Sequence, residues 1–449
     1  MTTVQPAQKR IKNLSEVALG FSKREAMEEA VRCPQPAQPE HIHRCPLGID
    51  IFGFIRRIRE GDAPGALAKI REQNHFPGIC GRICSAPCQK DLYEEEHWSI
   101  DIRALERYAA DNGQRKLSLE TGAIKKGKKI AVIGSGPSGL TAAADLANLG
   151  YSTVVFEALH LAGGILRYGI PEFRLPKKIL DAEISYLKLL GVEIKTNCFI
   201  GPTHTLKELF DMGFSAVYLA LGAGVPKFLG IPGENLSGVY SVSEYLLRAN
   251  LTDVASKDNS LATGKKIVVV GTGTDALDCA RVGIRLGKET VIVYELTQEE
   301  FKGSRKEIEY AKEEGVKFEM LTRPLEILND GRNGVKGLRC IKMDFADSES
   351  TGKWRLMPVG DSEFIINTDA VVVSGGYRPN SFIGRFTADL KLNDDGSIWV
   401  DEYTNMTSIP GVFAGGDVVH GHNAVIHAMA ASKKAAREIN RYLQQKSAK

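Results

Sequence analysis

Residues 128–157, KKIAVIGSGPSGLTAAADLANLGYSTVVFE, decide the fold. The run 128–134 is short, apolar and rich in Ile and Val, which predicts a buried strand. A glycine-rich turn, an alanine-rich helix and a second apolar run at 151–157 follow it. This order predicts a βαβ unit, in which the two strands lie parallel in one sheet.

The turn in this unit, Gly134 to Gly139, has the spacing GxGxxG. In a dinucleotide-binding turn the first glycine makes the bend and the second lets a pyrophosphate approach the backbone at the helix N-terminus. Glu157 ends the second strand, where a carboxylate accepts hydrogen bonds from a ribose hydroxyl. The alternative is a glycine turn that only packs a helix on a sheet.

The same pattern recurs at 265–295, KKIVVVGTGTDALDCARVGIRLGKETVIVYE. Ala276 takes the place of the third glycine, which the fingerprint tolerates. Two such units in one chain predict two nucleotide sites. A flavin and a nicotinamide are a chemically sensible pair, because a nicotinamide moves a hydride and a flavin can release electrons singly.

Composition and charge restrict which classes of function remain possible. The chain has 449 residues, 43% of them hydrophobic, and a formal net charge of +3, so nothing favours a nucleic-acid partner. No apolar run is long enough to span a bilayer, and the first residues lack the apolar segment of a secretory signal. We therefore expect a cytoplasmic protein with no membrane partner.

The cysteines are unevenly distributed. Five of the eight lie in the first fifth of the chain: Cys33, Cys45, Cys80, Cys84 and Cys88. In a reducing compartment such a group indicates metal or iron–sulfur ligation before it indicates disulfides. Around these cysteines, residues 51–73 and 100–113 have helical spacing and no stretch shows the alternation of a strand.

Several stretches together resemble the small (beta) subunit of bacterial glutamate synthase and its relatives, the N-terminal half of dihydropyrimidine dehydrogenase and the large subunit of ferredoxin-dependent transhydrogenases. These stretches are RCPLGIDI, CGRICSAPC, GSGPSGLTAAADLA, GGILRYGIPEFRLPK, LGIPGE and FAGGDVV. The resemblance implies an α/β chain with two Rossmann-like domains, for FAD and NAD, preceded by an α-helical iron–sulfur domain. The expected division is 1–122 for the helical domain, 123–260 and 373–449 for the two parts of the FAD domain, and 261–372 for the NAD(P) domain.

The resemblance also assigns site residues, none of them catalytic. Those expected at FAD are Gly134, Gly136, Pro137, Ser138, Gly139, Glu157, Gly164, Ile165, Arg174, Asp417 and Val425. Those expected at the nicotinamide nucleotide are Gly271, Gly273, Thr274, Asp275, Ala276, Glu295, Lys302 and Gly375. For Asp417 the residues alone leave a second interpretation open, namely an ordinary helix N-cap.

Of the two [4Fe–4S] clusters usual in this family, we expect one. The ligand positions of the first align with Cys33, Pro36, His41 and Leu92, and neither Pro nor Leu can bind iron. The ligands of the second are expected to be Cys45, Cys84, Cys88 and Glu106. Cys80 is an alternative fourth ligand, and from spacing alone a zinc site is an alternative to the cluster.

The nucleotide is expected to be NADH. Family members that prefer NADPH carry two arginines where this chain has Glu295 and Leu296, and a carboxylate repels a 2′-phosphate. Lys302 and Arg305 lie nearby and could partly restore phosphate binding.

The expected function is electron transfer between NADH, FAD, one cluster and a ferredoxin-like or catalytic partner subunit, in an oligomer or hetero-complex. The alternatives are a stand-alone diaphorase that reduces small acceptors, a glutamate synthase small subunit, and a scaffold with inert FAD.

Overall fold

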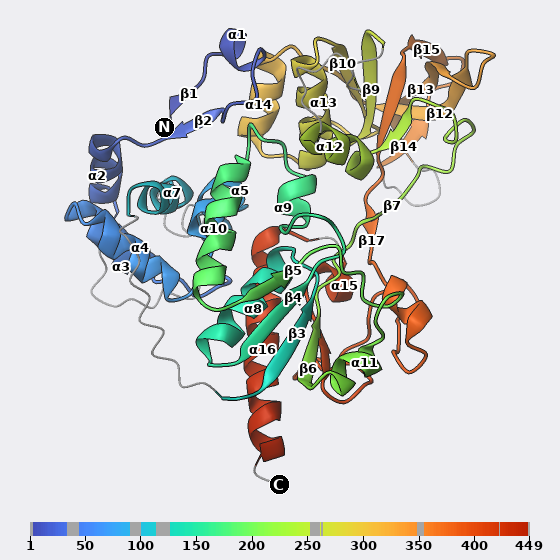
Figure 1. Cartoon of the computed structure of the whole chain (residues 1–449). Helices are drawn as coiled ribbons and strands as arrows, with labels where there is room; N and C mark the ends of the chain where they lie inside the picture. The colour runs from blue at the N-terminus through green and yellow to red at the C-terminus, as the bar shows by residue number, and fades with distance from the viewer. Residues whose placement is uncertain are drawn as a thin grey trace.

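The computed structural model describes residues 3–33, 45–89, 100–113, 126–251, 261, 264–347, 354–421 and 423–447. Its elements form a helical N-terminal part, a lower sheet and an upper sheet (Figure 1). Among the described helices, none is long and apolar enough to cross a bilayer.

The lower sheet contains the first predicted βαβ unit. Its five strands are parallel and lie in the order β18-β6-β3-β4-β5. They span Val412–Ala414, Phe214–Leu219, Lys129–Ile133, Ser152–Phe156 and Glu193–Lys195. Each central strand is buried on both faces, as its Val and Ile content predicts.

Helices cover this sheet. Helix α8 (Pro137–Asn148) connects β3 to β4, and the long helix α16 (Val425–Ser447) packs beside it. The remaining helices of this part are α9 (Ile165–Tyr168), α10 (Lys177–Leu189), α11 (Leu206–Asp211) and α15 (Asp417–His420).

The upper sheet contains the second predicted unit. Its five parallel strands lie in the order β11-β10-β9-β16-β8. They span Lys317–Glu319, Glu289–Val293, Lys266–Gly271, Ala370–Ser374 and Val239–Ser241. The helices are α12 (Val242–Leu251), α13 (Thr274–Arg285) and α14 (Arg305–Glu313).

The sequence prediction assigned residues up to 260 to the FAD domain. In the structure, however, strand β8 pairs within the upper sheet and helix α12 packs against that sheet. Strand pairing alone would move that boundary to a position before β8. The domain limits as a whole stay a prediction.

An antiparallel sheet extends the upper part. It pairs β12 (Thr322–Asn329) with β13 (Val335–Asp347), and β13 with both β14 (Trp354–Pro358) and β15 (Phe364–Asn367). Two short strands, β7 (Val225–Pro226) and β17 (Tyr377–Arg378), pair where the chain passes between the two parallel sheets (Figure 1). A short 3₁₀ helix, η3 (Phe382–Phe386), follows β17.

The N-terminal part is helical, as predicted. Its helices are α2 (Lys23–Val31), α3 (Ile51–Arg59), α4 (Ala63–Arg71), α5 (Pro77–Ile83) and α7 (Ile102–Asn112). Asp50, Asp62 and Asp101 cap α3, α4 and α7, each accepting a backbone N–H from the first turn. One continuous core of apolar side chains runs from these helices into α8 and α16, so the helical part packs directly on the lower sheet's helices.

One prediction for this region was wrong. Two short strands, β1 (Thr3–Val4) and β2 (Ala18–Gly20), flank a short helix, α1 (Ala7–Arg10), in a stretch expected to be wholly helical. They are too short to show alternation in the sequence. We call residues 3–20 the N-terminal strap.

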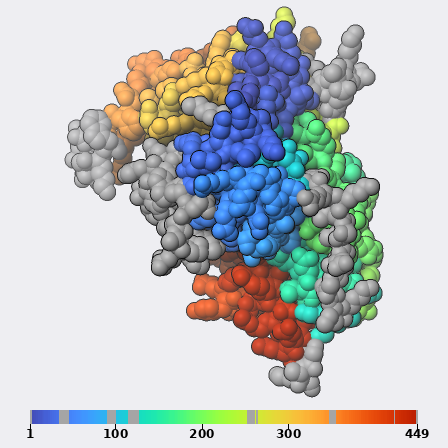
Figure 2. Space-filling view, turned by 90° about the vertical axis from the view of Figure 1, so that its left-hand side faces the viewer, coloured from blue at the N-terminus to red at the C-terminus, as the bar shows by residue number. Residues whose placement is uncertain are grey.

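The strap lies against the upper sheet's helices (Figure 2). The buried guanidinium of Arg10 donates from Nε to Glu314 Oε1 at 2.8 Å and from Nη2 to Glu313 Oε2 at 2.7 Å. Glu16, at the other end of the strap, pairs with Arg82 and Arg107 of the helical part. The strap therefore connects the helical part to the upper sheet.

Candidate functional site

The first glycine turn has three glycines with different surroundings. Gly134 has a φ of +101°, and a Cβ there would lie 2.4 Å from the Ala220 carbonyl oxygen. A Cβ on Gly139 would lie 1.9 Å from the Gly134 oxygen. A Cβ on Gly136 would have no atom within 4 Å. Gly134 and Gly139 are thus required by packing, whereas Gly136 borders open space, as a pyrophosphate-binding turn requires.

The N-terminus of α8 adds to this turn. Its N-cap is Gly136, which makes no side-chain cap, and Pro137 is the first helical residue. Its first-turn N–H groups therefore have no capping side chain in the described chain and suit an anionic ligand.

Other predicted FAD residues surround the same turn. A Cβ on Gly164 would lie 2.8 Å from the Gly136 Cα, so the two backbones touch. The Ser138 hydroxyl lies 2.8 Å from Tyr218 Oη and donates to the Gly415 carbonyl at 3.3 Å, which joins the loop after β18 to α8. Beside Gly164, the apolar side chain of Ile165 is 42% exposed.

Asp417 is the first residue of α15, and the N-cap is Gly416. The alternative interpretation of Asp417 as an ordinary N-cap is therefore wrong. Val425, predicted at FAD, begins α16 and is half-buried.

Glu157 is buried directly after β4, and its carboxylate holds the glycine turn. Oε2 accepts from the Ser135 backbone N–H at 2.9 Å and from the Ser135 hydroxyl, and Oε1 accepts from Leu159 N–H at 2.9 Å. A contact with a ribose hydroxyl would add to these bonds. Glu157 therefore has a structural role that the sequence did not indicate.

The second glycine turn repeats this arrangement. A Cβ on Gly271 (φ +129°) would lie 2.4 Å from the Ser374 oxygen, and one on Gly273 (φ +107°) would have no atom within 4 Å. Gly273 is the N-cap of α13, again without a side-chain cap, and Thr274 and Asp275 form the first turn. Ala276 is completely buried, consistent with a residue that packs the helix on the sheet.

Glu295 follows β10, at the edge where the second ribose is expected. Its Oε2 accepts from Arg323 Nε at 3.0 Å and from Nη2 at 2.9 Å, and both side chains are 40% exposed. The carboxylate is therefore oriented by a neighbour on β12. Lys302 is exposed between β10 and α14, and Gly375 follows β16.

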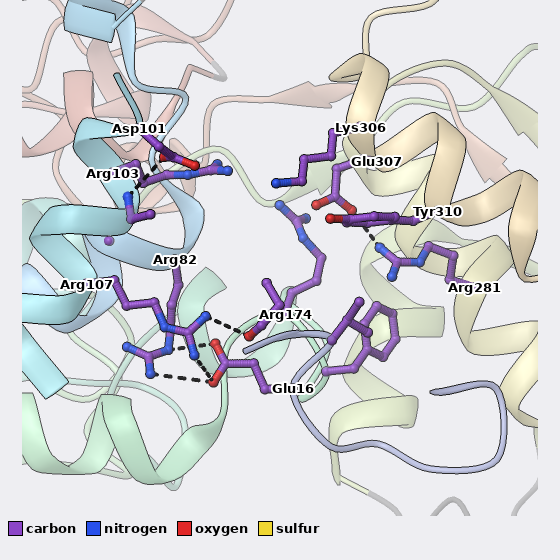
Figure 3. A pocket seen from close by; sticks show the side chains of 15 residues that line it. Glu16, Arg82, Asp101, Arg103, Arg107, Arg174, Arg281, Lys306, Glu307 and Tyr310 are labelled. Carbon is purple, nitrogen blue, oxygen red and sulfur yellow. Dashed lines mark hydrogen bonds and ion pairs between the residues drawn. The ribbon is translucent and has the colours of Figure 1, made fainter. Parts of the chain in front are cut away.

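Arg174, which is also assigned to FAD, forms an ion pair with a helix of the upper sheet. Its Nη1 donates to Asp278 Oδ2 of α13 at 2.6 Å. Figure 3 shows it in a pocket between the helical part, which supplies Arg82, Arg103 and Arg107, and α14, which supplies Lys306 and Glu307. Its contact with FAD stays a prediction.

A second cavity contains the predicted cluster ligands. Its wall includes Cys45, Cys84, Cys88 and Glu106, the four residues assigned to the cluster. The rest of the wall is mostly apolar: Pro46, Ile49, Ile51, Phe54, Ala86, Pro87, Ile102, Arg103 and Ile426. Within the described ranges, no three His, Cys, Asp or Glu side chains gather around a single metal position. The four donors instead surround a space, as the ligands of a multi-iron cluster do.

Cys80, the alternative fourth ligand, is not in this wall. It is buried, and its thiol lies 3.8 Å from the Met429 sulfur of α16. The geometry thus favours Glu106 over Cys80 as the fourth ligand.

Without a metal, burial disfavours the ionised forms of these four side chains. It raises the pKa of the Cys84 thiol to about 12 and that of the Glu106 carboxyl to about 8. The pKa values of the Cys45 and Cys88 thiols rise for the same reason. Iron would supply the positive charge that ionised thiolates and a carboxylate need in this cavity.

The predicted loss of the other cluster falls mostly outside the described residues. Cys33 is buried after α2, but Pro36, His41 and Leu92 lie outside those ranges. This loss stays a prediction.

We call the cavity lined by Cys45, Cys84, Cys88 and Glu106 the cluster cavity. The sequence did not indicate three residues that lie at or near it. Asn74 donates to Glu106, Arg103 donates to the Cys84 carbonyl, and Ile426 lies in the cavity wall beside Val425. None is part of a metal-ligand spacing, so only the fold brings them to the site.

Comparison with known proteins agrees with this geometry. Residues 128–435 match the family described as pyridine nucleotide-disulphide oxidoreductase, and residues 10–117 match dihydropyrimidine dehydrogenase domain II, 4Fe-4S cluster. Together with the two parallel sheets, these matches define a flavin- and nicotinamide-dependent iron–sulfur oxidoreductase.

The chain belongs to the glutamate synthase small-chain family of pyridine nucleotide-disulphide oxidoreductases. It is 32% identical to the glutamate synthase [NADPH] small chain of Azospirillum brasilense, over 100% of this chain and 95% of that one. It is also 35% identical to the NADP(+)-dependent formate dehydrogenase subunit beta of Moorella thermoacetica, over 90% of this chain but only 60% of the relative's length. The resemblance found in the sequence is thus confirmed.

Among solved structures, FprA from Mycobacterium tuberculosis (His57Gln mutant) has a TM-score of 0.59 at 20% identity, over 71% of this chain and 85% of that one. This similarity concerns the fold alone.

Proposed function

We propose that this chain transfers electrons between NADH, FAD and one [4Fe–4S] cluster, and to or from a ferredoxin-like or catalytic partner subunit. One observation carries the proposal: Cys45, Cys84, Cys88 and Glu106 line a single cavity whose wall includes Ile426. Ile426 lies in the first turn of α16, next to Val425 and shortly after the Asp417 loop. The proposed cluster and flavin sites therefore adjoin at the start of one helix.

The chain's own residues would bind and orient the cofactors. The Gly136 and Gly273 turns would hold the two pyrophosphates at the N-termini of α8 and α13. Bound FAD would accept a hydride from the nicotinamide and release electrons singly. Hydride transfer needs no acid or base from the protein, so we assign no catalytic residue.

The preference for NADH is supported by Glu295. By the family resemblance, members that prefer NADPH carry arginine at this position. Here the carboxylate instead accepts hydrogen bonds from the neighbouring cation, Arg323. Several relatives are named for NADPH or NADP(+), so this chain would differ from them.

The nucleotide preference is tested with Glu295→Ala. Removing the carboxylate releases Arg323 toward the 2′-phosphate, so kcat/KM for NADPH should rise about tenfold relative to NADH, a change of about 1.4 kcal/mol. Glu326→Ala is the matched control, because Glu326 of β12 forms a similarly exposed ion pair with Arg339 of β13. A wild-type preference for NADPH would contradict the assignment.

A single cluster would favour a small iron–sulfur partner that docks close to it, in a hetero-complex or oligomer. Three alternatives are a stand-alone diaphorase, the small subunit of a glutamate synthase, and a scaffold whose FAD is inert. The second is favoured by the match over nearly the full length of the Azospirillum brasilense protein.

Cofactor content tests the proposal. Protein purified without oxygen should contain one FAD, about four irons and a similar amount of sulfide per chain. Flavin without iron would contradict the proposed cluster and favour the diaphorase. About eight irons would contradict the loss of one cluster.

A further inference from the structure

The side chain of Asn74 touches the proposed fourth cluster ligand. Asn74 lies in the turn between α4 and α5 and is completely buried. Its Nδ2 donates to Glu106 Oε1 at 2.8 Å. Its Oδ1 accepts from the Phe76 backbone N–H at 2.9 Å, which fixes the orientation of the amide. Because a backbone N–H can only donate, the amino group must face the carboxylate.

This turn is anchored on two helices of the lower sheet. His75 Nε2 lies 2.7 Å from Asp145 Oδ1 of α8. Lys433 of α16 donates to the Gln73 carbonyl at 2.8 Å. The chain is therefore anchored on both sides of Asn74, which limits movement of its amide.

We infer that Asn74 is a positioning residue for the cluster. Its hydrogen bond to Glu106 Oε1 would hold the carboxylate in the orientation in which it binds iron. This inference rests on the proposed function, in which Glu106 is the fourth ligand.

The hydrogen bond should also set the reduction potential. A reduced cluster carries one more negative charge than an oxidised one, and a donor to an anionic ligand stabilises that charge. Losing the donor should therefore lower the potential.

The test compares three variants by cluster EPR and by redox titration. Asn74→Ala removes the donor, and Asn74→Leu removes it with little change in side-chain volume. Asp145→Asn is the control, because it weakens the anchor of the same turn without touching Glu106. Flavin content and thermal unfolding show whether each variant folds.

We expect both Asn74 variants to lower the ratio of reduced to oxidised cluster about tenfold at a fixed potential, or 59 mV for a one-electron couple. We also expect an altered EPR spectrum, and neither change in Asp145→Asn. An unchanged potential in both Asn74 variants, or an equal shift in Asp145→Asn, would overturn this inference while the proposed function stands. Wild-type protein that binds FAD but no iron would overturn the proposed function as well.

Discussion

Gly136 is the residue at which the flavin site can be tested with the least disturbance of the fold. Its φ is −70°, a conformation open to any residue, and no atom lies within 4 Å of an added Cβ. Gly134 and Gly139 lack this freedom, because a Cβ at either position would overlap backbone. A methyl group on Gly136 would thus contact no atom of the described residues, so any effect on FAD binding would come from the proposed pyrophosphate.

Gly136→Ala should therefore weaken FAD binding about 10- to 100-fold, the effect of a clash of about 1–3 kcal/mol. Unfolding of the FAD-free protein should be unaffected. Gly360→Ala is the control, since that position also has open space and an ordinary φ. The measurement compares the dissociation constants of the two variants for FAD, determined by fluorescence after removal of the flavin. Equal affinity in Gly136→Ala would place the flavin elsewhere.

Arg103 is the cationic side chain in the described wall of the cluster cavity. Its Nη1 donates to the Cys84 carbonyl at 3.1 Å, and its charge lowers the pKa of the Cys84 thiol against the larger effect of burial. An anionic cluster in an apolar cavity is stabilised by such a charge.

Arg103→Gln should consequently lower the cluster's reduction potential, because the reduced form loses more stabilisation than the oxidised form. Redox titration of the two proteins measures this. An unchanged or higher potential in the variant would show that the guanidinium faces away from the cluster.

The buried side chain of Glu183 connects helix α10 to helix α5. Glu183 of α10 accepts from Gly78 N–H of α5 at 2.8 Å and lies 3.4 Å from Arg71. Burial outweighs these partners and raises its pKa from 4.5 to about 7. Because the pKa of Glu183 is raised in the folded state, the contribution of this side chain to the free energy of unfolding is complete below pH 4.5. It is lost as the pH rises toward 7.

Glu183→Gln should remove this dependence. Between pH 5 and pH 8 the wild type should lose up to about 3 kcal/mol of unfolding free energy more than the variant. Denaturant unfolding of both proteins at the two pH values measures the difference. Parallel pH profiles would contradict the assignment of the effect to Glu183.

The elements show what the sequence could and could not predict. Both βαβ units were predictable, because buried parallel strands have continuous apolar runs and their turns need glycine. The placement of Cys45, Cys84, Cys88 and Glu106 around one cavity followed from the family motifs rather than from spacing alone.

Other features depend on contacts between distant segments. The pairing of β8 with β16 and the bond of Asn74 to Glu106 join residues far apart in the chain. Such pairs have no local pattern, so a single sequence does not reveal them.

At the scale of the whole molecule, the N-terminal strap joins the helical part to the upper sheet, the two parts that must cooperate. Arg10 is 1% exposed and bonds Glu314, which is also held by Arg281 and Arg285. Because the strap also reaches Arg82 and Arg107 through Glu16, it should limit movement of the upper sheet relative to the cluster cavity.

Arg10→Met should cost about 2 kcal/mol, since hydrogen bonds to charged groups are lost while Glu314 keeps two arginine partners. Arg24→Met is the control, because the Arg24–Glu28 pair is exposed and should contribute little. Thermal unfolding and limited proteolysis of the strap provide the measurements. Equal stability of the two variants would show that the strap does not support the fold.

The proposed electron path from nicotinamide to flavin to cluster is tested by anaerobic mixing of the purified protein with NADH in a stopped-flow spectrophotometer. About one NADH per chain should bleach the flavin absorbance, and electron transfer to the cluster should follow, as detected by EPR of frozen samples. Flavin that stays oxidised with both NADH and NADPH would contradict the proposed path.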